Sequence, residues 1–181
     1  GIYSGMMHSP YLNLAIFSKH FAEAQIDWPK PLVQSGFVDF DGMAQSLDPA
    51  TERFLSEGEA PLLFTLGSTT SERPGPILDV FLEVARKSSR RSLFVLGKKK
   101  ALELQSLNCE KIHVTSFVPY SQVMPRAQLI VHQGGVGTTA QAMRSSRPSL
   151  IVADVNDQPD NGRLLRRSGL GDWIHMKHAA P

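Results

Sequence analysis

The segment from Leu129 to Thr139 combines a run of apolar residues with groups that could bind an anion. The run predicts a strand that ends just before His132, whose imidazole could donate a ring N–H to a phosphate. The glycines that follow allow positive φ and close approach of a ligand, and the N-terminus of the next helix favours a phosphate. Beside His132, the predicted anion-binding residues are Gly134, Gly135, Gly137, Thr138 and Thr139.

This loop is open to other interpretations. The glycines could serve a tight turn alone, with His132 at the end of a strand. The residues from Gly135 to Ala140 also satisfy the G-x-G-x-x-A pattern of dinucleotide-binding domains, and Asp154 lies nineteen residues after Gly135, where a ribose-binding carboxylate belongs. A Walker-type phosphate loop is excluded, because no lysine follows the glycines at the required place.

The elements that must position this loop alternate between short apolar runs and stretches of helical period. Strands are predicted at 62–66, 92–96, 112–116, 128–131 and 149–153, and helices at 77–87, 120–126, 138–144 and 159–167. Strands that alternate with helices imply an α/β fold of Rossmann-like type, a parallel sheet with helices on both faces. Ligands bind beyond the carboxyl ends of such strands, which is where His132 lies.

The part of the chain before this sheet has a different composition. Residues 27–61 are rich in proline and acidic side chains, which is typical of a linker, with a short helix predicted at 49–56. We therefore divide the 181-residue chain into residues 1–60, the end of a preceding domain and a linker, and residues 61–181, one ligand-binding domain.

Composition narrows the class of partner. The net charge of +2, with 20% charged residues, lacks the basic excess of a nucleic-acid-binding protein. The single cysteine, Cys109, excludes an internal disulfide and a cysteine-rich metal site, and no metal is expected. No run of about twenty apolar residues predicts membrane insertion, and the start of the chain has no signal-peptide pattern. A cytoplasmic protein is expected.

Several further motifs surround the loop in one order along the chain. They are Phe117-Val118-Pro119-Tyr120, His132-x-Gly134-Gly135-x-Gly137-Thr138, Arg147-Pro148, Asp157-Gln158-Pro159-Asp160-Asn161 and Ser168-Gly169-Leu170-Gly171. Through them residues 117–171 resemble the C-terminal donor-binding domain of GT-B-fold glycosyltransferases that use nucleoside-diphosphate sugars. The likeness extends to nearly the whole chain through Asp27-Trp28-Pro29, Ser35-Gly36-Phe37 and Phe64-Thr65-Leu66-Gly67-Ser68. The superfamily includes flavonoid, sterol and bacterial antibiotic transferases. The resemblance implies that the predicted sheet is the C-terminal half of a GT-B fold.

The resemblance also implies roles for individual residues. His132, the amides from Gly134 to Gly137, and the hydroxyls of Thr138 and Thr139 would bind the donor diphosphate, together with Ser68 after the first strand. Phe117 would stack on the base and the backbone of Val118 would hydrogen-bond its edge. Asp157 and Gln158 would hold hydroxyls of the transferred sugar. For Asp157 the alternative is a helix N-cap ahead of Pro159.

Two positions depart from the family pattern. Many relatives bind the ribose through a glutamate eight or nine residues after the histidine, where this chain has Ala140 and Gln141. Gln141 is therefore the candidate for ribose contact. Tyr120 stands where plant relatives have glutamine, which leaves both uridine and thymidine diphosphate sugars as candidate donors.

The activity implied is transfer of a hexosyl group from a UDP- or TDP-sugar to an acceptor hydroxyl, with inversion and without a cofactor or metal. In the family the general base lies on the N-terminal domain. We therefore predict no catalytic residue in this chain, no activity for the chain alone, and its own missing N-terminal domain as partner. Two alternatives stay open, an NAD(P)-binding domain of an oxidoreductase and the donor-binding subunit of a two-chain glycosyltransferase.

Overall fold

The computed structural model describes residues 8–38, 40, 46–67 and 75–179. The chain divides into two compact units, Gly1–Phe40 and Asp41–Pro181. The first unit contains two short parallel strands, β1 (Asn13–Ala15) and β2 (Leu32–Gln34). Among the described residues, no helix is both long and apolar enough to cross a bilayer.

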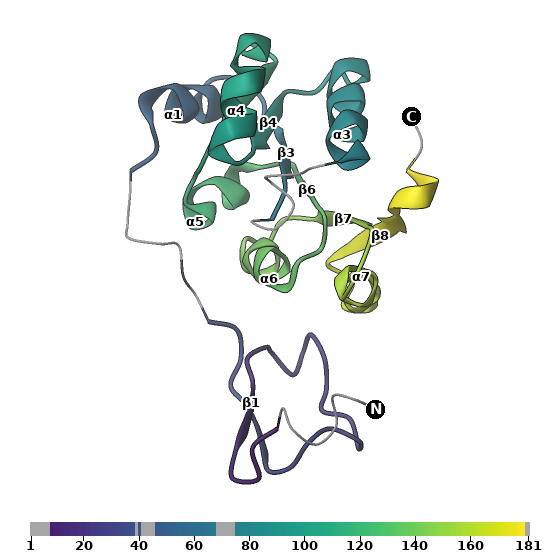
Figure 1. The fold of residues 1–181 in the computed structure, drawn as a ribbon. Helices are drawn as coiled ribbons and strands as arrows, with labels where there is room; N and C mark the ends of the chain where they lie inside the picture. Colours follow the sequence, from purple (N-terminus) through teal and green to yellow (C-terminus); the bar gives the residue numbers. More distant parts are fainter. Residues whose placement is uncertain (1–7, 39, 41–45, 68–74, 180–181) are drawn as a thin grey trace. The chain divides into compact units, whose positions relative to one another are not determined.

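The second unit is a six-stranded parallel sheet with helices on both faces (Figure 1), which confirms the predicted fold class. The strands are β3 (Leu62–Thr65), β4 (Ser92–Val95), β5 (Ile112–Thr115), β6 (Leu129–His132), β7 (Ser149–Ala153) and β8 (Gly171–His175). The α-helices are α1 (Pro49–Ser56), α3 (Pro76–Lys87), α4 (Lys98–Leu104), α5 (Tyr120–Val123), α6 (Val136–Arg144) and α7 (Gln158–Arg167). Short 3-10 turns follow at Gln105–Leu107, Met124–Arg126 and Met176–His178.

Most predicted elements are present within one or two residues of their expected ends. The sequence interpretation missed α4, the edge strand β8 and the two short strands β1 and β2 of the first unit. It also placed α1 before the domain boundary, whereas α1 lies in the same unit as the sheet. There Phe54 and Leu55 pack with Leu63, Leu93 and Val95 in one hydrophobic cluster. The side chain of Asp48 begins α1 by accepting hydrogen bonds from the amides of Ala50 and Thr51.

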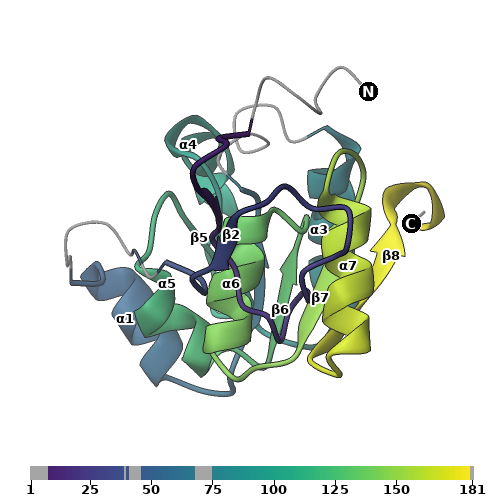
Figure 2. The same ribbon diagram turned by 90° about the horizontal axis from the view of Figure 1, so that it is seen from below.

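The hydrophobic core lies on both faces of the sheet. On one face, α3 and α4 pack on Phe64, Phe94 and Val131. On the other, α1, α5 and α6 pack around Leu63 and Ile130, and α7 packs on the neighbouring part of the same sheet (Figure 2). The central strands β3 and β4 are buried on both faces, which explains why they read as uninterrupted apolar runs.

The strand order is β5-β4-β3-β6-β7-β8. Counted from the first strand of the sheet, this is the doubly wound order 3-2-1-4-5-6. The order reverses between β3 and β6, whose paired residues run from Leu62 and Leu129 to Thr65 and His132. The helix after β3, α3, packs on one face of the sheet and the helix after β6, α6, on the other, and sheets of this order bind ligands beyond the carboxyl ends of the strands at such a reversal.

Candidate functional site

The switch-point site consists of the end of β3 as far as Gly67, the loops that follow β6 and β7, and the N-terminus of α6. Gly135 is the N-cap of α6, and in the described part of the chain no side chain caps its amides. Gly137 is exposed and Thr138 is half-buried, so the first turn of the helix is accessible. Uncapped amides at a helix N-terminus attract anions, which matches the predicted chemistry of this loop.

The second threonine of the loop is placed differently. Thr139 is fully buried, and its hydroxyl donates a hydrogen bond to the carbonyl oxygen of Gly135 at 3.0 Å. That bond lies within the first turn of α6, as is common for threonine in a helix. Thr138 therefore offers the more accessible of the two predicted hydroxyls.

His132 lies beneath the loop and is fully buried. The amide of Gly134 donates to its Nδ1 at 3.1 Å, so the ring proton is on Nε2, which lies 2.9 Å from the hydroxyl of Ser149. Both ring nitrogens of His132 therefore have protein partners, and the ring is part of the buried interior. A direct hydrogen bond from this ring to a phosphate requires one of these bonds to break.

Burial also decides the charge of His132. It disfavours the imidazolium and lowers the pKa of His132 from 6.5 to about 4. The unfolded chain binds this proton at about pH 6.5, and the folded chain does so at about pH 4. The ring is therefore neutral at neutral pH, and it holds the loop by hydrogen bonds rather than by charge.

A pH-dependent loss of stability follows from this shift. Above pH 6.5 the contribution of neutral His132 to the free energy of unfolding is complete, and between pH 6.5 and 4 it falls by up to about 3 kcal/mol. In the His132→Gln variant this component is absent, so the wild type should lose more stability than the variant on acidification. Urea unfolding at pH 7.5 and 4.5 measures the difference. Burial also lowers the pKa of half-buried His113, but this histidine is present in both proteins, so its contribution cancels in the comparison. Parallel losses would contradict the assignment.

A hydrogen bond that the sequence interpretation missed ties the loop to α7. Nδ2 of buried Asn161 donates to the carbonyl oxygen of Gly134 at 2.8 Å and to Oδ2 of Asp157, also at 2.8 Å. Asn161 lies inside the motif already noted and is one helical turn after Asp157. That spacing could have suggested the contact between these two side chains.

The predicted sugar-binding pair follows β7 at the start of α7. Asp157 is exposed and occupies the N-cap position, but its side chain makes no capping hydrogen bond among the described residues. Gln158 is buried, and its Oε1 accepts from the amides of Asp154 at 2.9 Å and Val155 at 3.3 Å. The amide oxygen of Gln158 therefore holds the loop after β7, while Asp157 is exposed and its Oδ2 accepts the hydrogen bond from Asn161.

The residues predicted to contact the nucleoside are Phe117 and Val118, between β5 and α5, and Gln141 on α6. Phe117, after β5, is 52% exposed and can present a ring face, whereas Val118 is buried in the core. Gln141 on α6 lines a cavity of about 170 Å³ together with Tyr120 and Ser121. Ser68, the remaining predicted phosphate contact, lies outside the described residues.

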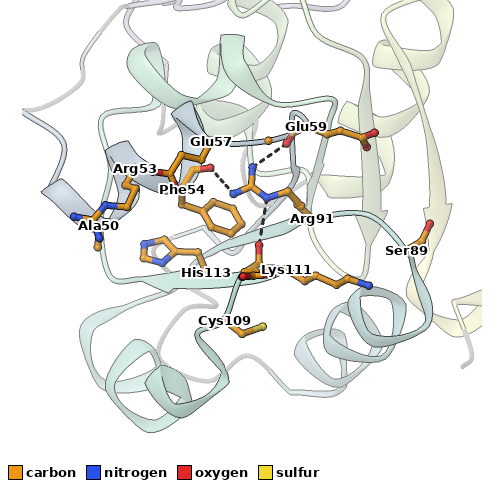
Figure 3. Close-up of a pocket in the computed structure, with 12 residues that line it drawn as sticks. Ala50, Arg53, Phe54, Glu57, Glu59, Ser89, Arg91, Cys109, Lys111 and His113 are labelled. Atoms are coloured by element: carbon orange, nitrogen blue, oxygen red, sulfur yellow. Dashed lines mark hydrogen bonds between the residues drawn. The ribbon is translucent and has the colours of Figure 1, made fainter.

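A cavity of about 730 Å³ lies at the opposite end of the sheet (Figure 3). It is lined by α1, by residues that precede β4 and β5, including Arg91 and Cys109, and by His113 on β5. The guanidinium of Arg91 donates to the carbonyl oxygens of Phe54, Glu59 and Glu110, so it links the segments around the cavity. This cavity is at the amino ends of the strands, away from the switch-point site. Nowhere in the described ranges do three or more His, Cys, Asp or Glu side chains gather as ligands for a metal ion.

Comparison with known proteins relates this chain to sugar-transferring enzymes. O-mycaminosyltylonolide 6-deoxyallosyltransferase of Streptomyces fradiae is 35% identical over 161 residues, which are 88% of this chain and 37% of that protein. A sterol 3-beta-glucosyltransferase of Arabidopsis thaliana is 27% identical over 158 residues, which are 86% of this chain and 24% of that protein. No protein-family model matches the chain.

Solved structures give the same fold. Spinosyn rhamnosyltransferase complexed with spinosyn aglycone superposes with a TM-score of 0.74 at 18% identity, over 96% of this chain and 46% of that one. The same enzyme complexed with thymidine diphosphate superposes with a TM-score of 0.69 at 18% identity, over 93% of this chain and 44% of that one. The chain thus spans less than half the length of each of these proteins.

Proposed function

Since the chain is homologous to the macrolide and sterol glycosyltransferases and has the fold of GT-B C-terminal halves, we propose that its switch-point site binds a nucleoside-diphosphate sugar. The observation that carries the proposal is the uncapped N-terminus of α6, which follows the glycine loop at the strand-order reversal. A relative of this fold complexed with thymidine diphosphate supports it.

The proposed contacts follow the sequence prediction, except that Thr139, whose hydroxyl is bonded within α6, is left out and His132 has an indirect role. The diphosphate lies against the first amides of α6 and contacts the hydroxyls of Thr138 and, as the resemblance implies, of Ser68. The base stacks on exposed Phe117 and hydrogen-bonds the backbone of Val118, Gln141 contacts the ribose, and Asp157 and Gln158 contact the sugar. His132 supports the site indirectly, because its Nδ1 accepts a hydrogen bond from the Gly134 amide and so fixes the loop that carries the phosphate contacts.

The proposed reaction is transfer of a hexosyl group to an acceptor hydroxyl, with inversion and without a metal. As the bond to the anomeric carbon breaks, the nucleoside diphosphate gains negative charge. Preorganised N–H groups at the helix N-terminus stabilise that charge, and loss of one such donor in other enzymes costs about 2.7–4 kcal/mol. The chain thus supplies the leaving-group half of the reaction, and we propose that an N-terminal domain supplies the acceptor pocket and the general base.

Replacement of Gly137 by alanine tests the phosphate site. No heavy atom of the described residues lies within 4 Å of the added Cβ, so the folded chain should accept the methyl group and gain up to about 1 kcal/mol of helix stability. The same methyl group stands where the diphosphate approaches the amides. We expect calorimetric titration to show at least tenfold weaker binding of UDP and TDP.

Two controls separate this result from a general effect. Val84→Ala, at an exposed position on α3, should leave the affinity for both diphosphates unchanged. NADH should bind neither protein. Tight NADH binding that Asp154→Ala abolishes, with no response to UDP or TDP, would establish the dinucleotide interpretation instead.

A further inference from the structure

Gln133 follows β6 directly and is buried, with 6% of its surface exposed. Its side-chain oxygen Oε1 has no hydrogen-bond partner among the residues that the structure describes. Its Nε2 lies against Gly67, since a Cβ added at Gly67 would be 2.5 Å from that nitrogen. The amide of Gln133 thus extends from the end of β6 toward the end of β3, across the point where the strand order reverses.

An unpartnered acceptor in this position is unusual for a folded protein. Most buried polar side-chain atoms have a hydrogen-bond partner, because a desolvated oxygen without one is unfavourable. The neighbouring polar side chains at the site follow that rule, since His132, Thr139 and Asn161 all have partners. Oε1 of Gln133 lacks such a partner among the described residues, and it lies where sheets of this strand order bind their ligands.

We propose that Oε1 of Gln133 accepts a hydrogen bond from a hydroxyl group of the bound nucleotide sugar, which makes Gln133 a specificity-determining residue. The inference rests on the proposed function. Diphosphate oxygens carry no proton at neutral pH and cannot be the donor. The base is proposed to stack on Phe117 beyond β5, about 10 Å from β3 at the usual strand spacing. The donor is therefore a hydroxyl of the ribose or of the transferred sugar.

The Gln133→Leu and Gln133→Ala variants of the full chain test this role. Either change removes the buried acceptor. Because leucine nearly keeps the side-chain volume of glutamine, Gln133→Leu should not lower the stability of the unliganded chain. Affinity for UDP-glucose or TDP-glucose should drop about three- to tenfold, the effect of one hydrogen bond. Urea unfolding and calorimetric titration with UDP, UDP-glucose, TDP and TDP-glucose measure both quantities.

The four probes distinguish the two hydroxyl sources. Weaker binding of the sugar-bearing probes alone assigns Gln133 to the transferred sugar, whereas an equal drop for UDP and UDP-glucose assigns it to the ribose. Affinities within twofold of the wild type for every probe overturn the inference and leave the proposed function intact. Lower affinity with a clear loss of stability in both variants makes Gln133 a packing residue and also overturns it. A wild-type chain that binds none of the probes overturns the proposed function, and this inference with it.

Discussion

Replacing Gly134 with alanine is expected to destabilise the folded chain by about 2–5 kcal/mol, a large part of the stability of a typical domain. Gly134 has φ of +95°, a conformation that is unfavourable for alanine. The added Cβ would also lie 2.6 Å from Cγ2 of fully buried Ile151. The backbone of Gly134 cannot shift freely to relieve this contact, because its carbonyl oxygen accepts a hydrogen bond from Asn161 and its amide donates one to His132.

Chemical denaturation of the variant measures this loss, and Gly137→Ala is the matched control. The two glycines lie three residues apart, Gly134 in the loop and Gly137 in the first turn of α6, and receive the same methyl group, but Gly137 has open space around it. Gly134→Ala should therefore lose stability while Gly137→Ala keeps it and loses nucleotide affinity. A free energy of unfolding within about 0.5 kcal/mol of the wild type for Gly134→Ala would show that this loop rearranges freely.

The 181-residue chain by itself is expected to form no detectable glycoside, even with saturating donor. It spans 37% of the Streptomyces fradiae relative, and the acceptor pocket and general base are proposed to lie on an N-terminal domain. General base catalysis contributes about 10²–10⁴-fold, and positioning of the acceptor contributes more. Product formation from labelled UDP- or TDP-glucose with phenolic, sterol and sugar acceptors is the measurement.

The control for this experiment is nucleotide binding by the same preparation, which shows that the donor site is folded. Addition of an N-terminal domain should restore turnover, because the two reactants would meet between the domains. Robust glycoside formation by the isolated chain would show that it holds a complete active site. The proposal that an N-terminal domain supplies the acceptor pocket and the general base would then be wrong.

Local sequence patterns were sufficient for most of the fold. The apolar runs of β3, β4 and β7 and the helical period of α3 predicted those elements within a residue or two, because burial on both faces of a parallel sheet selects uninterrupted apolar strands. The edge strand β8 was missed because it is less buried, and its residues Gly171–His175 carry no such run. The helix α4 was missed because it opens with three lysines and buries a single residue, Ala101.

The sequence by itself also predicted the kind of site, since glycines between a strand and a helix are typical of an anion-binding loop. Only the tertiary structure decided which way each side chain points. His132 and Thr139 turn inward, Phe117 and Asp157 stay exposed, and Gln133 is buried across the switch point. These orientations depend on neighbours distant in sequence, such as Ser149 for His132 and Gly67 for Gln133, because a side chain near a strand end is placed by the adjacent strand.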